Sequence, residues 1–234
     1  MWKYMARLTG QQREEYVQSM FTRIAGHYDL MNRLMTGGQD TRWRKRVIEL
    51  ARLTPDAYLL DLGTGTGDLA REALAQCPQA KVIAADFTLE MMRVGQRQDS
   101  LTFSEANALC LPFNDSAFDV VVSGFLMRNV VDLQKALQEQ YRVLKNDGRV
   151  VILDTTRPRK NILSPFIRLH MHVVIPALGR LVTSSRGAYS YLPESTEGFI
   201  TAEEMAAHMA SVGFKKVGYQ RFMFGIIVIH WGEK

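Results

Sequence analysis

The sequence predicts an α/β fold, a Rossmann-like, seven-stranded, mostly parallel sheet that ends in an antiparallel hairpin. Short apolar runs alternate with segments of helical periodicity along most of the chain. The first apolar run, 58–62, leads into a loop with glycine at every second position, Gly63, Gly65 and Gly67, and then into a helical segment. A strand, a glycine-rich loop and a helix in this order typically cradle a nucleotide-like ligand.

Length and composition bound the class of protein. The 234 residues, 47% hydrophobic and 23% charged, suit one globular domain spanning 1–234. No apolar run reaches the roughly 18 residues of a membrane-spanning helix. The first twenty residues also lack the apolar core of a secretory signal. We therefore expect a cytoplasmic protein.

Helices are expected before the first strand, within residues 1–53. Apolar side chains recur at helical spacing over 11–35 and again over 40–52. Asp40 or Thr41 is the expected N-cap of the second segment, and Thr54-Pro55-Asp56 breaks it.

The rest of the chain alternates. After 58–62, strands are expected at 81–85, 101–104, 118–123, 149–154, 214–220 and 225–231. Helices are expected at 68–76, 89–97, 132–145 and 201–211. Asn146-Asp147-Gly148 indicates a tight turn before the fifth strand. The last two strands are close in sequence, so they are expected to pair antiparallel.

Residues 155–200 interrupt the alternation before the last helix. This insert is apolar on nearly every face and contains Pro165 and Pro176. We expect a buried helical cap that lines a tunnel for an apolar substrate, with direct insertion into a membrane as the alternative.

The glycine spacing favours S-adenosylmethionine (SAM) over a dinucleotide. The loop reads G-x-G-x-G, whereas the dinucleotide fingerprint is G-x-G-x-x-G; a turn without a ligand is the alternative. Asp86 ends the second strand, where its carboxylate can accept hydrogen bonds from ribose hydroxyls. Its alternative role is to cap the next helix, for which Thr88 is better placed.

Three further polar or aromatic positions complete the expected cofactor site. Asn107 follows the third strand, where its amide can pair with adenine, and Phe113 is expected near the base. Asp61 ends the first strand and is expected to accept hydrogen bonds from loop amides or from the methionyl ammonium. Cys77 and Cys110 lack metal-ligand spacing, so no metal site is expected.

Part of the net charge of +5 comes from two groups of basic residues that are close together in sequence. One basic group, Arg42, Arg44, Lys45 and Arg46, surrounds Trp43, and the other comprises Arg157, Arg159, Lys160 and Arg168. Such groups contact nucleic acid or anionic lipid, or are simply solvated. Methylation of base amino groups typically uses an Asp/Asn-Pro-Pro-aromatic motif after the fourth strand, but residues 123–126 contain no proline. We therefore expect no nucleic-acid partner.

Three longer stretches carry a family resemblance. They are FTRIAGHYDLMNRLM at 21–35, MRNV at 127–130 and YSYLPES at 189–195. Together with DLGTGTGD, EANALCLPF, YRVLKNDGR and FGIIVIHWG, they resemble the ubiquinone/menaquinone biosynthesis C-methyltransferase family over roughly residues 15–232. The YDLMN and RNV motifs are much more specific than the glycine loop.

The resemblance implies SAM-dependent C-methylation of a quinol ring that bears a polyprenyl tail, either demethylmenaquinol or the corresponding ubiquinone precursor. It places cofactor contacts at Thr66, Asp86, Asn107 and Ala108, and its strand-four serine corresponds to Gly124, beside Ser123. The complete candidate cofactor set is Asp61, Gly63, Thr64, Gly65, Thr66, Gly67, Asp86, Phe87, Asn107, Ala108, Ser123 and Gly124.

The resemblance also places Tyr28, Arg128 and Asn129 beside the acceptor as catalytic residues. Because a guanidinium stays protonated, we expect Arg128 to stabilise the developing phenolate and orient a water, with Asn129 holding that geometry. The alternative for Arg128 is a salt bridge with a surface acid. The proton acceptor is left open among water, Asp154, His27, His170 and His172.

Some alternatives stay open at this point. Leu126 stands where the family usually has glycine, which changes the pocket wall and leaves the acceptor less certain than the reaction. Another small aromatic or secondary-metabolite acceptor is one alternative function, and a non-catalytic SAM-binding module is another. Partners are expected to be a lipid-soluble quinol and an anionic membrane surface, and the chain is either a monomer or a homodimer.

Overall fold

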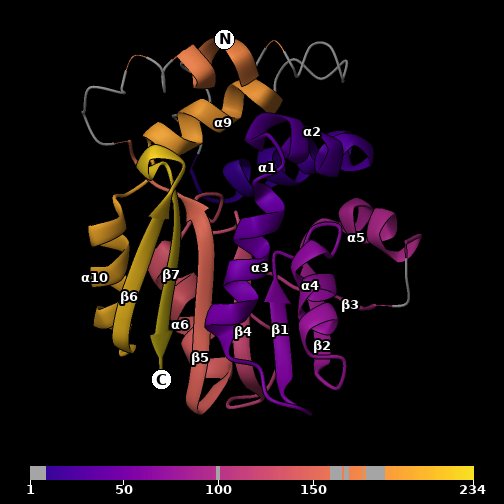
Figure 1. Cartoon of the computed structure of the whole chain (residues 1–234), viewed down its shortest axis with the longest axis vertical. Helices are drawn as coiled ribbons and strands as arrows, with labels where there is room; N and C mark the ends of the chain where they lie inside the picture. The colour runs from indigo at the N-terminus through magenta and orange to yellow at the C-terminus, as the bar shows by residue number, and fades with distance from the viewer. Residues whose placement is uncertain (1–8, 99–100, 159–164, 166–168, 176, 178–187) are drawn as a thin grey trace.

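The computed structural model describes residues 9–98, 101–158, 165, 169–175, 177 and 188–234. Its centre is a seven-stranded sheet in the order β3-β2-β1-β4-β5-β7-β6 (Figure 1). The bounds are β1 Tyr58–Leu62, β2 Lys81–Asp86, β3 Thr102–Glu105, β4 Phe118–Gly124, β5 Leu144–Thr155, β6 Lys215–Phe222 and β7 Ile227–Glu233. Strand β7 runs antiparallel to both β5 and β6. The predicted fold class is confirmed.

The predicted strands differ from the observed ones mainly at β5. This strand begins at Leu144, where it already pairs with Phe118, and the register shifts before Val120. Asp147 has a φ of 62°, so the expected turn at 146–148 is a local irregularity within the strand.

The helices of the described residues cover both faces and one end of the sheet. They are α1 Gly10–Ile24, α2 Tyr28–Thr36, α3 Asp40–Ala51, α4 Asp68–Gln76, α5 Leu89–Gln96, α6 Leu133–Val143, α9 Ala188–Glu197 and α10 Ala202–Val212, with short turns at η2 Ala25–His27, η3 His170–Val174 and η4 Met223–Gly225. The N-cap of α3 is Gln39, so the expectation of Asp40 or Thr41 was wrong. The Asp40 carboxylate instead binds Arg44 one turn along the helix.

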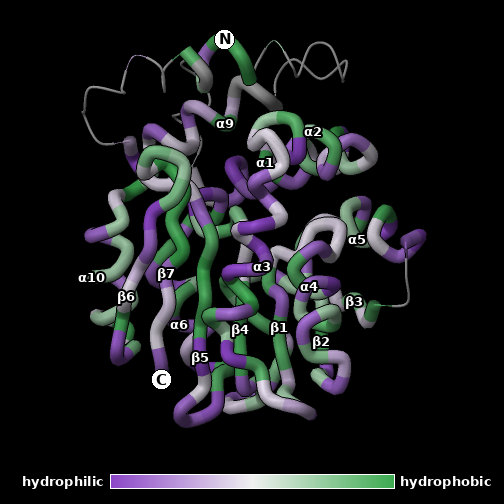
Figure 2. The backbone as a smooth tube through the Cα atoms, viewed as in Figure 1, coloured by the Kyte–Doolittle hydropathy of each residue, from purple (hydrophilic) through white to green (hydrophobic). Residues whose placement is uncertain are grey.

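The core has two layers because successive strand residues face opposite sides of the sheet. Leu60 and Val121 pack beneath α6 and α10, whereas Leu59 and Val122 pack beneath α3 and α4. Figure 2 shows hydrophobic residues concentrated along the central strands. Trp43 of α3 is buried in the second layer.

The burial of α3 corrects one expectation about charge. Trp43 and Arg44 are both buried, so residues 42–46 do not form one exposed basic patch. The second expected basic group lies largely outside the described residues, since only its Arg157 is described.

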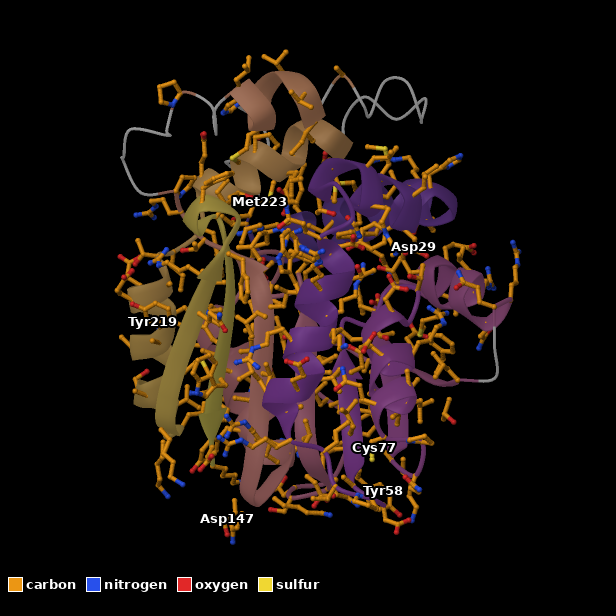
Figure 3. All side chains as sticks on the ribbon, in the orientation of Figure 1. Asp29, Tyr58, Cys77, Asp147, Tyr219 and Met223 are labelled. Carbon is orange, nitrogen blue, oxygen red and sulfur yellow. The ribbon has the colours of Figure 1, made fainter. Side chains whose placement is uncertain are left out.

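Helices α1, α2 and α9 gather at the carboxyl ends of the parallel strands, whereas α3 runs along a face of the sheet (Figure 1). Asp29 and Met223 lie at this end in Figure 3, opposite Tyr58 and Asp147. Ligands of doubly wound sheets bind at this end. Met171 and Ile175 of the insert are buried, as expected for a cap, but Val173 is exposed. No helix among the described residues is long and apolar enough to cross a membrane.

The close contact between α5 and the glycine loop yields a stability prediction. A Cβ at Gly95 would overlap the carbonyl oxygen of Thr66 and lie 2.7 Å from Cζ of Phe103. Gly95→Ala should therefore lower the free energy of unfolding by about 1–3 kcal/mol, the usual cost of overpacking. Gly26→Ala is the matched control, because its Cβ would meet no atom within 4 Å. Chemical denaturation of both variants measures the difference, and equal stabilities would contradict this packing.

Candidate active site

The glycine loop joins β1 to α4 and shapes the floor of the site. Gly63 and Gly67 have φ values of 68° and 99°, which side-chain-bearing residues rarely adopt. A Cβ at Gly63 would lie 2.9 Å from Cδ1 of Leu126, and one at Gly67 would lie 2.8 Å from Cδ1 of Leu101. Because Gly63 has no side chain, Leu126 in the loop after β4 can pack against it. In the same way, Leu101 before β3 packs against Gly67.

Asp61 lies at the base of this loop and is fully buried. Its Oδ2 accepts hydrogen bonds from Oγ1 of Thr64 (2.5 Å) and from the amide of Ala70 (3.0 Å). Its Oδ1 has no hydrogen-bond partner among the described residues. Burial raises the pKa of Asp61 to about 7. A carboxylate with one unpaired oxygen beside a hollow lined by the loop fits the ammonium group of SAM.

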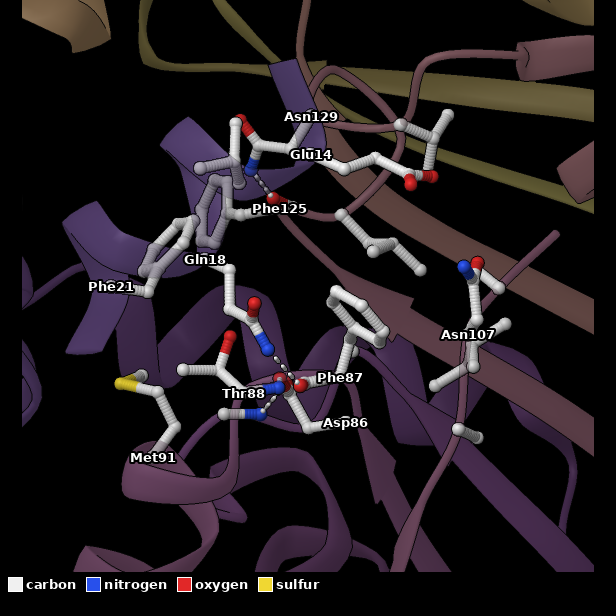
Figure 4. Close-up of a pocket in the computed structure, with 18 of the residues that line it drawn as sticks. Glu14, Gln18, Phe21, Asp86, Phe87, Thr88, Met91, Asn107, Phe125 and Asn129 are labelled. Carbon is white, nitrogen blue, oxygen red and sulfur yellow. Dashed lines mark hydrogen bonds between the residues drawn. The ribbon is translucent and has the colours of Figure 1, made fainter. Parts of the chain in front are cut away.

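Asp86 at the end of β2 connects the loop to α5. Its Oδ2 accepts from the amide of Gly65 and its Oδ1 from the amide of Thr88, both at 2.7 Å (Figure 4). A carboxylate has about four acceptor positions, so Asp86 is a candidate to accept from ribose hydroxyls as well. Thr88 occupies the N-cap of α5, but its side chain makes no capping bond. Asp86 therefore holds the start of α5, which was its alternative role, and its contact with ribose stays a prediction. Burial raises its pKa.

A pocket of about 800 Å³, open to solvent, lies between these strand ends and α1. Seven of the residues predicted to bind the cofactor line it: Gly63, Gly65, Asp86, Phe87, Asn107, Ala108 and Gly124. Oδ1 of Asn107 accepts from the amide of Leu109 at 2.9 Å, which holds the side chain at the pocket edge. Asp61, Thr64 and Thr66 line the adjoining hollow beneath the loop.

Three expected contacts lie elsewhere. Gly67 lines neither hollow and serves the packing described above. Ser123 is fully buried and does not line the pocket. Phe113 packs edge-to-face on Phe118, with ring centroids 5.2 Å apart, and not at the base site.

Helix α1 is a part of the site that sequence reasoning missed. Glu14, Gln18 and Phe21 line the pocket from above (Figure 4). Nε2 of Gln18 donates to the carbonyl of Phe87 at 3.1 Å, which ties the helix to the pocket rim. Helical periodicity indicated only that α1 has an apolar face, with no sign of what it covers.

A second pocket of about 910 Å³ adjoins the first. Phe21, Tyr28, Phe125 and Asn129 line both pockets, so the two meet at these side chains. The rest of its lining is mostly apolar and includes Met20, Ile24, Met31, Met35, Met171, Ile175, Leu192, Met223 and Ile226. A polar junction followed by a long apolar lining suits a ligand with a polar ring and an apolar tail.

Arg128 lies in the wall of the second pocket and is buried against Asp154. Its Nη1 lies 2.6 Å from Oδ1 of Asp154, whose Oδ2 accepts from the Arg128 backbone amide at 3.2 Å. The salt bridge considered for Arg128 therefore exists, but with a buried acid and not a surface one. Its Nε is buried and has no partner among the described residues.

The other titratable candidate residues are Tyr28 and the histidines. Burial raises the pKa of Tyr28, so its phenol is protonated near neutral pH. His27 and His172 line neither pocket, and Nε2 of His172 lies 2.9 Å from Oε1 of Glu197. The side chain of His170 is outside the described residues.

Fold and site together define a SAM-dependent methyltransferase. The strand order with its antiparallel β7, the glycine loop after β1 and the acid after β2 all belong to that class. The chain belongs to the ubiE/COQ5 methyltransferase family, whose model matches residues 9–234.

Curated relatives agree with this assignment, and a solved structure shares the fold. The Desulfotalea psychrophila ubiquinone/menaquinone biosynthesis C-methyltransferase UbiE is 44% identical over 221 residues, 93% of this chain and 90% of that protein. The Thermus thermophilus demethylmenaquinone methyltransferase is also 44% identical, over 92% of this chain and 100% of that protein. A SAM-dependent methyltransferase from Thermotoga maritima shares the fold, with a TM-score of 0.65, 18% identity and coverage of 92% of this chain and 99% of that one.

The buried carboxylate of Asp61 yields a pH prediction. Its pKa of about 7 exceeds the ordinary value of 3.8, so in the absence of SAM its ionisation lowers stability as pH rises from about 4 to about 7. Asp61→Asn removes that ionisation and keeps an oxygen for Thr64 and Ala70. Without SAM, the variant should melt above wild type at pH 8 and approach it near pH 4.

The same substitution should weaken SAM binding if the Asp61 carboxylate faces the ammonium as expected, because a neutral amide replaces it. Loss of a charged hydrogen bond costs about 1.5–3 kcal/mol, roughly tenfold or more in Kd. Titration calorimetry at pH 8 measures this change. Unchanged SAM affinity would argue that Asp61 does not contact the cofactor.

Proposed function

We propose that this enzyme transfers the methyl group of SAM to a ring carbon of a polyprenylated quinol, either demethylmenaquinol or the demethylated ubiquinone precursor. The observation that carries the proposal is the meeting of the two pockets at Tyr28, Phe125 and Asn129. A quinol ring at this junction is within reach of the cofactor pocket, and its tail extends along the methionine-rich lining. Methionine is flexible and polarisable, so such a lining adapts to tails of different shape.

The cofactor and the protein make separate contributions to the reaction. When bound, SAM supplies an electrophilic methyl group on an excellent leaving group. The chain must raise electron density on the ring carbon, which ionisation of the neighbouring hydroxyl provides. Arg128 stabilises the resulting phenolate, and Asn129 donates a second hydrogen bond. A carbon–carbon bond forms as the sulfur–methyl bond breaks and its electron pair stays on sulfur. The ring carbon then gives its proton to water, which restores aromaticity.

The proton acceptor is best assigned to water. Asp154 is engaged with Arg128, and neither His27 nor His172 lines a pocket. Arg128 lines the quinol pocket, so its guanidinium can orient a water beside the quinol hydroxyl. Water is therefore the candidate that the described geometry favours over these side chains.

The decisive assay compares methyl transfer to demethylmenaquinol with transfer to the demethylated ubiquinone precursor, each over a series of tail lengths. Activity that rises with tail length supports the apolar pocket as the tail site. Equal activity without a tail would favour another small aromatic acceptor. SAM binding without transfer to any acceptor would favour a non-catalytic module.

We also infer that the enzyme takes its quinol from a membrane surface. Six side chains form what we call the apolar rim: Leu30, Leu34, Leu169, Val173, Val174 and Phe224, between 38% and 71% exposed. They belong to α2, the segment around η3, and η4, which also supply Met31, Met171 and Met223 to the quinol pocket. Exposed apolar side chains around the mouth of an apolar pocket suit a bilayer surface.

The role of Arg128 can be tested by Arg128→Lys. Removing the guanidinium altogether leaves Asp154 buried and unpaired, at about 3–5 kcal/mol of stability, so lysine is the cleaner change. Turnover should fall about 10²-fold, because an ammonium cannot reproduce the planar donor set, while SAM affinity stays near that of wild type. Arg46→Lys, at an exposed ion pair with Glu49, is the control. Equal losses of SAM affinity and turnover would instead make Arg128 a structural residue.

Membrane contact can be tested by Leu34→Ser combined with Phe224→Ser. The double variant should sediment less with phosphatidylglycerol vesicles and methylate a long-tailed quinol in vesicles more slowly, with unchanged activity on a short, soluble one. Leu89→Ser is the control, since Leu89 is similarly exposed but not part of the rim. If ultracentrifugation shows that the double variant dissociates a dimer while vesicle binding is unaffected, a second copy of the chain covers the rim instead.

A further inference from the structure

We propose that Tyr191 is a positioning residue that holds the amide of Asn129 for methyl transfer. The proposal rests on the proposed function, because it concerns how the quinol oxygen is stabilised. Tyr191 lies on α9 in the insert, 62 residues from Asn129 in sequence, yet its hydroxyl donates to Oδ1 of Asn129 at 3.1 Å. The insert therefore contributes to the reacting centre in addition to covering it.

The direction of each hydrogen bond follows from the chemistry of the partners. Nδ2 of Asn129 lies 2.9 Å from the backbone carbonyl of Phe125, which can only accept. The nitrogen must therefore face Phe125, and the amide oxygen must face Tyr191, whose hydroxyl then donates. The backbone carbonyl of Phe125 thus holds the amide nitrogen of Asn129, and the Tyr191 hydroxyl on α9 holds the amide oxygen.

This anchoring leaves one useful donor. An amide nitrogen carries two hydrogens, and the Phe125 carbonyl takes only one of them. Asn129 lines both the cofactor pocket and the quinol pocket, so its second N–H is at the junction where the phenolate forms. A donor that is already oriented stabilises developing charge without reorganising during the reaction.

The surroundings of Tyr191 support a fixed position for its ring. The ring centroid lies 6.0 Å from that of Tyr16 on α1. Tyr191 lines the quinol pocket, and together with Arg128, Arg13 and Glu194 it also lines a separate hollow. The ring is thus part of the wall between two hollows, and only the hydroxyl reaches Asn129. Tyr191→Phe removes that hydroxyl and keeps the wall.

The expected result for Tyr191→Phe is a fall in kcat of about tenfold, the order of one lost hydrogen bond, with KM for SAM unchanged. The acidic limb of the kcat–pH profile should move to higher pH, because the phenolate is less stabilised. In an Asn129→Ala background the same change should cause no further loss, since both act through one amide. Tyr16→Phe, which retains the ring pair and lies outside both pockets, should match wild type.

A readout without substrate separates this proposal from the identity of the acceptor. The ¹H–¹⁵N signals of the Asn129 side-chain amide, assigned by their absence in Asn129→Ala, should shift in Tyr191→Phe and not in Tyr16→Phe. Unshifted signals, an unmoved pH profile or losses that multiply in the double variant would overturn the positioning role. If wild type methylates no quinol while the amide signals still shift, the proposed acceptor fails but the contact stands.

Discussion

The buried ion pair between Arg128 and Asp154 is the interaction on which the site depends. Neither charge could be buried alone without a large loss of hydration, so each requires the other. Because Arg128 follows β4 and Asp154 is near the end of β5, the pair joins two neighbouring strands at their carboxyl ends. The carbonyl of Arg128 also accepts from Arg13 of α1 at 2.9 Å. One segment thus links the sheet, the quinol pocket and the helix over the cofactor.

A second charged network secures the N-terminal helices to the glycine loop. Nη1 of Arg44 lies 2.8 Å from Asp40 and 2.7 Å from Asp68, which joins α3 to the start of α4. Oδ1 of Asp29 on α2 accepts from Oγ1 of Thr66 at 2.7 Å. These contacts hold α2 and α3 against the loop, and hydrogen bonds from Arg13 and Gln18 hold α1 over the pocket. A basic residue that composition suggested for a partner surface is an internal link instead.

The strands and the outline of the cofactor site could be predicted because their signals are local. Strand β1 and helix α4 were predicted with their observed bounds, since apolar runs, glycines and periodicity report on a few neighbouring residues. Asp86 was found because it ends an apolar run before a helix. Ser123 and Phe113 were misplaced because the direction of a side chain depends on which neighbours cover it. The Tyr28 and Arg128 assignments came from resemblance, as no local pattern indicates them.

The sequence by itself determined the fold class, the glycine loop and the acids at the strand ends, because backbone preference and hydrophobic period act over short distances. Only the tertiary structure decided that Arg44 is buried, that Asp154 pairs with Arg128 and that Tyr191 reaches Asn129. Those contacts join segments that are separated in the chain. No local sequence pattern indicates that the paired residues lie close together. The junction of the two pockets, where methyl donor and acceptor meet, is a product of that packing.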